Sequence, residues 1–293
     1  MENTIQKYEA FVETVEQGSF TKAAQVLSYT QSGISRMIAE LERSWGVKLL
    51  RRGRGGVELT SEGALILPYV REICLRQRNL QMEIDSISGL QAGMIRIGTF
   101  ASVAAQWLPA MIKAFQADYP GIDYQLFIGD YAEIDHWIEE GRVDCGFTIY
   151  SKQAKLEFTP IGSDRMFAVL PPTHKMAKRK RFPIKSLEGE PFLMPEVGTD
   201  TYVYDLLRDA DVKPDIILST PDDYVILSMV ESGLGVSLMP ELILERNPYN
   251  TISRPLDIPA RREIGFAYKG GEEVPLVVRT FLNYVKRPEK TAD

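Results

Sequence analysis

The sequence contains little cysteine and histidine and no long hydrophobic run. Two cysteines and two histidines occur in 293 residues, which excludes a disulfide framework and is typical of a protein from a reducing cytosol. The longest apolar stretch, residues 64–70, is interrupted by Pro68 and falls far short of the roughly 20 residues that cross a bilayer. The first residues form neither a basic nor an apolar segment, so we expect no secretory signal, no membrane partner and a cytoplasmic protein.

Motifs for catalysis, metal binding and nucleotide binding are also missing. The sequence has no Gly-x-Ser-x-Gly elbow, no P-loop and no dinucleotide fingerprint. His136 and His174 lie at metal-ligand spacing neither from each other nor from a cysteine, so we expect no metal ion and no cofactor. Cys145 falls in an apolar strand pattern and has no second cysteine after residue 90 with which to form a redox-sensing pair. We therefore do not expect an enzyme.

Positive charge is concentrated in one short segment of an otherwise acidic chain. The chain has 34 basic and 40 acidic side chains, a net charge of −6. Residues 31–54 contain six basic and two acidic side chains, whereas residues 61–293 contain 26 basic and 33 acidic ones. A local positive patch on an acidic body is typical of a surface that binds a polyanion. From charge alone, a basic face that is simply solvated is the alternative.

The first 60 residues have the pattern of short helices joined by tight turns. Apolar residues at helical spacing predict helices over residues 4–16 and 19–27. A third helix is predicted from Ser28, as the N-cap of a capping box with Gln31, to about residue 44. Two short apolar runs, residues 47–50 and 57–60, flank a tip rich in arginine and glycine and predict a basic β-hairpin.

The third helix has a polar face that fits DNA. A short helix, a tight turn and a second helix form helix-turn-helix geometry, in which the second helix enters the major groove. Glutamine can pair with adenine and arginine with guanine, while serine hydroxyls reach bases or phosphates. We expect base contacts from Gln31, Ser32, Ser35 and Arg36, and backbone or minor-groove contacts from Thr30, Lys48, Arg52 and Arg54. For any one of these residues, a polar face turned to solvent is the alternative.

Residues 61–90 form one long helical pattern with coiled-coil spacing. The predicted seam consists of Ile66, Val70, Ile73, Gln77, Leu80, Ile84 and Ile87. Such a narrow stripe needs a partner helix, so the pattern predicts pairing with a second copy of the chain. Packing of the stripe on the chain's own body is the alternative.

From residue 94 the pattern alternates between strands and helices. Strands are predicted over 94–100, 122–128, 143–149, 166–170, 192–194, 216–218, 236–239 and 263–268, and helices over 103–117, 131–140, 201–210, 222–232 and 275–286. This alternation predicts an α/β fold with a parallel sheet, and ligands bind such folds where strands end beside helices. The candidates at those positions are Ser102, Gly129, Thr148, Gly198 and Thr199. For Ser102 and Thr199, helix capping is the alternative role.

Several motifs together resemble the LysR-type transcriptional regulators. In the first 63 residues they are Phe11-x8-Phe20-Thr21-x-Ala23-Ala24-x2-Leu27, Thr30-Gln31-Ser32-x2-Ser35-Arg36-x-Ile38-x2-Leu41-Glu42, Gly46-Val47-x-Leu49-Leu50-x-Arg52 and Leu59-Thr60-x2-Gly63. In the remainder they are Leu108-Pro109, Phe115-x3-Tyr119-Pro120, Gly141-x2-Asp144, His174 and Val230-x2-Gly233-Leu234-Gly235-Val236-x2-Met239-Pro240. The hairpin departs from the family pattern because it is richer in glycine and arginine.

The resemblance implies a multidomain protein. It implies an all-α winged helix-turn-helix DNA-binding domain at 1–60, a linker helix for dimerisation at 61–90, and an α/β effector domain at 93–293. The effector domain is expected to have the two-subdomain, type 2 periplasmic-binding-protein-like fold, with subdomain I at 93–161 plus 267–293 and subdomain II at 162–266. A small molecule would bind between the subdomains. From the residues themselves, the hydroxyl of Ser102 and the backbone amides at the start of the following helix could hold a carboxylate.

The resemblance also implies partners. These are double-stranded DNA, a small-molecule effector, a second copy of the chain in a dimer and further copies in a tetramer, and RNA polymerase. The function we expect is that of a sequence-specific transcription regulator controlled by its effector. The alternatives from other classes are a solute-binding or transport protein built on residues 93–293, which would have no use for residues 19–60, and an enzyme.

Overall fold

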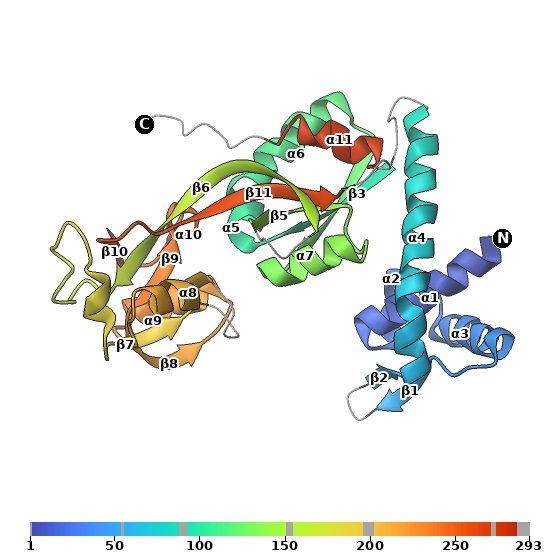
Figure 1. Ribbon diagram of the computed structural model, residues 1–293, viewed down its shortest axis with the longest axis horizontal. Helices are drawn as coiled ribbons and strands as arrows, with labels where there is room; N and C mark the ends of the chain where they lie inside the picture. The colour runs from blue at the N-terminus through green and yellow to red at the C-terminus, as the bar shows by residue number, and fades with distance from the viewer. Residues whose placement is uncertain are drawn as a thin grey trace.

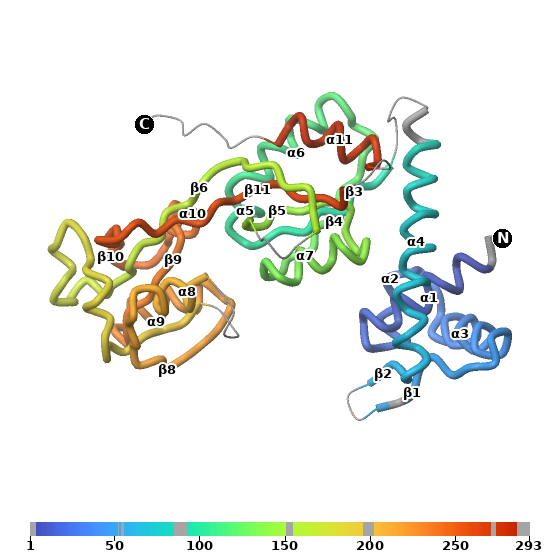
Figure 2. The backbone as a smooth tube through the Cα atoms, viewed as in Figure 1, coloured from blue at the N-terminus to red at the C-terminus, as the bar shows by residue number. Residues whose placement is uncertain are grey.

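The computed structural model describes residues 2–53, 56–87, 93–150, 155–195, 202–270 and 274–285. A small helical domain, one long helix and a two-part α/β domain follow one another along the chain (Figure 1). The tube view shows the lower half of the long helix lying across the N-terminal domain and its upper half extending beside the nearer half of the α/β domain (Figure 2). Within the described residues, no helix is long and apolar enough to span a membrane.

The N-terminal domain consists of three helices and a hairpin. The helices are α1 (Glu2–Gln17), α2 (Phe20–Val26) and α3 (Gln31–Trp45), and the hairpin pairs β1 (Leu50–Gly53) with β2 (Gly56–Leu59). Their apolar faces meet in one core with Phe11, Ile34 and Ile38 buried at its centre. The predicted helices and hairpin are confirmed, with ends that differ by one to three residues.

The start of α3 differs from the predicted capping box. The N-cap is Thr30, whose hydroxyl accepts a hydrogen bond from the Gly33 amide at 3.1 Å. Ser28 instead lies in the preceding turn with φ at +58°, a left-handed conformation that cannot begin a helix. The helix ends at Gly46, whose φ of +71° favours glycine.

The long helix α4 (Ser61–Ile87) continues through Pro68 and has two apolar faces. Val70 is 3% exposed and Ile66 is partly buried, and both pack on the chain's own N-terminal core. The predicted seam is therefore wrong at these two positions, because the helix turns them towards its own domain. The exposed stripe is made of Leu65, Tyr69, Ile73, Leu80 and Ile84, with exposed Gln77 inside it.

Subdomain I is built around the central strand β3 (Gly93–Thr99). Its neighbours β4 (Ile122–Ile128) and β5 (Cys145–Ile149) are parallel to it. The covering helices are α5 (Ala101–Gln106), α6 (Leu108–Asp118), α7 (Tyr131–Glu139) and α11 (Leu276–Leu282). The single helix predicted over 103–117 is wrong, because it divides at buried Trp107 into α5 and α6. Pro109 lies in the first turn of α6, where proline is tolerated because its missing amide would have no partner within the helix.

Subdomain II has its own core and mostly short elements. These are η1 (Ile184–Leu187), β7 (Pro191–Met194), α8 (Tyr202–Asp209), β8 (Asp215–Ser219), α9 (Asp223–Glu231), β9 (Ser237–Pro240), α10 (Glu241–Leu244) and β10 (Ile252–Pro255). Strands β7 and β8 are parallel, whereas β9 and β10 pair antiparallel with a strand of the larger sheet.

Two long strands join the subdomains. β6 (Leu156–Leu170) and β11 (Arg261–Lys269) are antiparallel neighbours, with Asp164 opposite Arg262 where they cross between the subdomains (Figure 1). The order of the large sheet is β10-β6-β11-β5-β3-β4, and β9 also pairs with β6. The predicted parallel pairing is confirmed for β3 with β4 and β5 and for β7 with β8. The sheet as a whole is mixed, because the crossing strands β6 and β11 are antiparallel to each other and β11 is antiparallel to β5.

Candidate DNA-binding surface and effector cleft

The polar face of α3 is turned to solvent. Thr30, Gln31, Ser32, Ser35 and Arg36 are all exposed, while Ile34, Ile38 and Leu41 on the opposite face are buried. Helical periodicity seats one face in the core, which holds the other face in a defined orientation. Five of the predicted DNA-binding residues therefore share one accessible surface.

Arg36 is held in place although it is exposed. Its Nε donates to Glu40 at 3.0 Å, one turn along α3, and its side chain remains 82% exposed. Lys7 on α1 contacts the same carboxylate at 2.9 Å. The hydrogen bonds from Lys7 and Arg36 lower the pKa of Glu40, so this carboxylate stays charged and anchors the guanidinium at the helix surface.

Lys48 is placed beside the hairpin by Glu42. Its ammonium lies 2.5 Å from one oxygen of Glu42, whose other oxygen accepts from the amides of Leu49 and Leu50. Burial alone raises the pKa of Glu42, but these hydrogen bonds together lower it. The Lys48 side chain is 78% exposed and lies at the base of the hairpin.

The hairpin is attached to the turn between α1 and α2. The Val57 amide donates to the Gly18 carbonyl at 3.0 Å, and a Cβ on Gly56 would lie 2.5 Å from that same oxygen. Glycine is therefore required at 56 by close approach and by a φ of +131°. Two of the predicted DNA contacts fall in the hairpin. Arg52 lies in β1, but its side chain is outside the described part of the structure, and Arg54 is outside it entirely.

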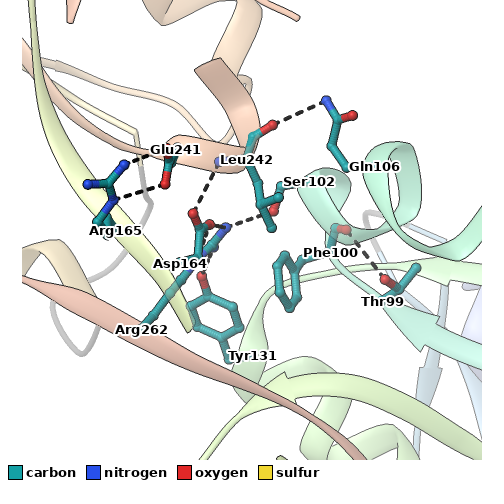
Figure 3. Close-up of polar contacts among 10 residues, drawn as sticks. All are labelled: Thr99, Phe100, Ser102, Gln106, Tyr131, Asp164, Arg165, Glu241, Leu242 and Arg262. Carbon is teal, nitrogen blue, oxygen red and sulfur yellow. Dashed lines mark hydrogen bonds and ion pairs between the residues drawn. The ribbon is translucent and has the colours of Figure 1, made fainter. Parts of the chain in front are cut away.

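A buried arginine ties the two subdomains together (Figure 3). Arg262 on β11 donates to Asp164 from Nε and Nη2 at 3.1 and 2.7 Å, to the Ser102 hydroxyl at 2.7 Å, and to the Tyr131 hydroxyl. Its guanidinium also lies 4.8 Å from the centre of the Phe100 ring. Asp164 also accepts from the Leu242 amide at 3.1 Å, so the Arg262–Asp164 pair joins groups from α5, α7 and α10.

The charges at this junction depend on each other. Asp164 and Arg262 have side chains that are 2% and 5% exposed. Burial raises the pKa of Asp164, and Arg262 opposes that rise. Burial lowers the pKa of Arg262, but Tyr131 and Asp164 together raise it, so the guanidinium remains charged. Removing either partner would leave an uncompensated charge in the interior.

A cavity of about 310 Å³ lies beside this junction and between the subdomains. We call it the cleft. Its walls are Ala101, Ser102, Ala105, Gln106, Pro221, Asp222, Asp223, Tyr224, Leu242 and Ile243. Ser102 does not cap α5, because the N-cap is Phe100 and the Ser102 oxygen accepts from Arg262 instead.

The other predicted effector residues are less directly placed. Thr148 is 2% exposed at the end of β5, and Gly129 follows β4 with the Trp137 ring against it, so that a Cβ would lie 2.4 Å from the ring. Neither is among the described residues that line the cleft. Gly198 and Thr199 lie outside the described residues.

Sequence reasoning missed Arg262, Asp164 and Tyr131. One signal was available, since Arg262 precedes an apolar strand segment, Ile264 to Ala267, where a charged side chain needs a partner. The sequence could not predict that the partner is Asp164, because Asp164 lies 98 residues earlier in the chain.

Comparison with known proteins agrees with this architecture. The profile of the bacterial regulatory helix-turn-helix protein, lysR family, matches residues 5–64, and that of the LysR substrate binding domain matches residues 88–288. The uncharacterized HTH-type transcriptional regulator YvbU of Bacillus subtilis is 29% identical over 97% of this chain and 98% of its own length. The probable HTH-type transcriptional regulator LrrA of Synechococcus elongatus is 30% identical over 86% of both chains.

Solved structures show the same fold over the full length. Full-length CbnR complexed with its target DNA has a TM-score of 0.68 at 21% identity, covering 96% of this chain and 98% of its own. A cysteine variant of full-length OxyR from Pseudomonas aeruginosa has a TM-score of 0.71 at 18% identity, covering 99% and 98%. The chain belongs to the LysR family of transcriptional regulators: it binds DNA through its helix-turn-helix domain and responds to a small-molecule effector through its C-terminal domain.

Proposed function

We propose that α3 reads the operator in the major groove. Gln31, Ser32, Ser35 and Arg36 would contact base edges, and the observation that carries this proposal is their common exposure on a helix whose other face is buried. Glutamine and arginine can each form paired hydrogen bonds with one purine, which makes them suited to base recognition. Thr30, Lys48, Arg52 and Arg54 would contact the DNA backbone, because exposed Thr30 and Lys48 carry the hydroxyl and cationic groups that bind phosphate. For Arg52 and Arg54, whose side chains lie outside the described residues, the proposal rests on the sequence.

The test is selection of binding sites from a duplex library, followed by variants of Arg36. Arg36→Ala should cost about 1–3 kcal/mol of binding free energy and relax preference at one base position. As a control, Arg208→Ala removes one positive charge from an exposed position on α8. It should change neither the binding free energy nor the base preference. Equal weakening on every sequence would contradict base recognition and leave Arg36 as a phosphate contact.

We further propose that two chains pair through the exposed stripe of α4. Leu65, Tyr69, Ile73, Leu80 and Ile84 lie four, four, seven and four residues apart. With exposed Gln77 between Ile73 and Leu80, the second half of the stripe alternates steps of four and three, as in a coiled-coil seam. Pairing would present two copies of α3 to one duplex, which matches the two half-sites of a palindromic operator. Tetramer assembly, contact with RNA polymerase and a cytoplasmic location complete the proposal and rest on membership of the family.

We propose that the effector is a small carboxylate bound in the cleft. The Ser102 oxygen accepts from Arg262, so its hydroxyl proton is left to donate to a ligand oxygen. Asp222 lies on another wall, with one oxygen on the Tyr224 and Val225 amides at 3.0 and 3.1 Å. A carboxylate at Ser102 and an ammonium near Asp222 would suit an amino acid, which is therefore the first class to test.

A thermal-shift screen of small carboxylates and amino acids tests this site. A ligand at 100 times its Kd stabilises the folded protein by about 2.7 kcal/mol. Ser102→Ala should weaken the ligand that is found by about two- to tenfold, since it removes one hydrogen bond, whereas Ser102→Thr keeps the hydroxyl. A ligand that binds Ser102→Ala and Ser102→Thr with the same affinity binds elsewhere.

We infer that the protein acts by binding and not by catalysis. Turnover of any compound in a broad substrate screen would contradict this inference.

A further inference from the structure

Four charged side chains join the DNA-binding domain to subdomain I. Glu16 at the end of α1 contacts Arg71 of α4 at 3.8 Å and Arg142, which follows α7, at 3.3 Å. Arg71 also pairs with Glu140, the C-cap of α7. The four side chains are 10–26% exposed, so solvent screens these ion pairs less than it screens pairs on an open surface. We call Glu16, Arg71, Glu140 and Arg142 the latch.

The interface around the latch is polar and loosely filled. A cavity of about 470 Å³ lies between α1, α4 and subdomain I, and the four latch residues are among those that line it. Among the described residues lining it, the buried Nε atoms of Arg71, Arg78 and Arg142 and the Tyr124 hydroxyl make no hydrogen bond, so the 3.3 Å contact of Arg142 with Glu16 is an ion pair without hydrogen-bond geometry. Unpaired buried polar atoms disfavour the docked arrangement unless water reaches them. The contact is therefore suited to opening and closing, unlike a tightly packed apolar core.

Helix α7 connects the latch to the effector cleft. Its first residue, Tyr131, accepts from Arg262 at the junction between the subdomains, and Glu140 and Arg142 follow its last turn. Glu140 lies nine residues after Tyr131, about 14 Å along a helix. The buried face of α7, Ile134 and Ile138, packs over Gly146, where a Cβ would lie 2.9 Å from Ile134 and 3.2 Å from Ile138. Small sliding of packed helices is an established way for proteins to transmit a local change.

We propose that the DNA-binding domain docks on subdomain I through the latch, and that α7 couples this docking to the cleft, so that the effector adjusts the position of α3. This rests on the proposed function for its effector and its operator. The coupling itself is a property of the free protein. Loss of the Tyr131 contact at one end of α7 shifts the docking equilibrium at the other end.

The experiment measures the distance between the two domains in the full-length chain. Spin labels are attached to Lys22→Cys on α2 and Lys113→Cys on α6, both exposed, while native Cys74 and Cys145 are buried. Labelled chains are diluted with unlabelled ones so that each distance lies within a single chain. Neither DNA nor effector is added, so failure to find an operator or an effector leaves the measurement intact.

The parent chain should give a docked distance as the main population. Glu16→Gln and Arg142→Gln should each raise the ratio of undocked to docked chains by about threefold or more, and the double variant should add little to either single one. Tyr131→Phe should shift the same ratio although it removes no latch residue. Arg208→Gln, which removes an ion pair on α8, should leave the distances unchanged.

Two results would overturn the proposal. Unchanged distances in both Glu16→Gln and Arg142→Gln would show that the latch does not hold the domains together. A response to these variants with none to Tyr131→Phe would show docking without coupling to the cleft. Circular dichroism of each variant confirms that it is folded before its distances are compared.

Discussion

The buried pair of Arg262 and Asp164 makes a strong prediction about stability. Arg262→Met keeps most of the side-chain volume but removes the guanidinium, which leaves Asp164 as a carboxylate with a side chain 2% exposed and no cationic partner. Removing one member of a buried ion pair costs about 3–5 kcal/mol. A domain of this size loses about 2–4 °C of Tm per kcal/mol, so the effector-domain transition should fall by roughly 10 °C.

The loss should depend on pH with a definite sign. Without Arg262, burial raises the pKa of Asp164 in the folded state further above its unfolded value. A folded-state pKa above the unfolded one gives stability that is present at low pH and is lost as pH rises through the folded pKa. The deficit of Arg262→Met relative to the parent protein should therefore be smaller at pH 5 than at pH 8.

A second substitution isolates the pair. Asp164→Asn removes the negative charge but keeps an oxygen that can accept from the Leu242 amide, as Asp164 does at 3.1 Å. In the double variant the uncompensated charge is gone, so most of the lost Tm should return. The assay is scanning calorimetry of the full-length protein at both pH values. A double variant as unstable as Arg262→Met alone, or a single variant as stable as the parent, would refute the reasoning.

Three further predictions concern the helices. Thr30→Ala removes the N-cap of α3 and should lower the stability of the DNA-binding domain by about 1 kcal/mol, whereas Thr30→Ser should be close to neutral in chemical denaturation. Leu80→Glu places a charge in the exposed stripe of α4 and should shift the protein from dimer to monomer in analytical ultracentrifugation. The control Lys113→Glu, at an exposed position on α6, should leave the dimer intact. A dimeric Leu80→Glu variant would contradict pairing through α4. Burial raises the pKa of Cys74 to about 11, so an alkylating reagent at pH 8 should modify it slowly in the native protein and rapidly after unfolding; equal rates would refute its burial.

Local patterns predicted the DNA-binding domain well. The buried and exposed faces of α3 follow directly from the positions of Ile34, Ile38 and Leu41, because a helix repeats every 3.6 residues. The prediction of the N-cap of α3 failed because two nearby residues are both suited to that position by type. Serine and threonine both favour the N-cap position, and the left-handed backbone at Ser28 leaves Thr30 as the N-cap.

In the long helix α4, periodicity predicted the apolar stripe but not what packs against it. The heptad spacing in residues 61–90 was visible, but two apolar faces overlap at its beginning. Val70 and Ile66 were predicted to lie in the seam that faces a partner chain, but they pack in the chain's own N-terminal core. Spacing identifies a stripe, but it does not say which neighbour will cover the stripe.

The effector domain was predicted less completely. Its alternating strands and helices were recognised, yet β6 extends over 15 residues and runs antiparallel to β11, so the sheet is mixed. Strand direction depends on which partner the chain finds. A strand pattern has the same period of two whether its neighbour runs parallel or antiparallel.

The amino-acid sequence by itself determined the helical character of the N-terminal segment, the exposed polar face of α3 and the α/β character of the remainder, because these depend on periodicity over a few turns of chain. Tertiary structure decided the junction of Arg262, Asp164, Ser102 and Tyr131, and the latch on α1, α4 and the end of α7. These groups are brought together from positions as many as 160 residues apart. Their charges are stable in the interior only with their partners, and the choice of partner is made when the strands and helices pack.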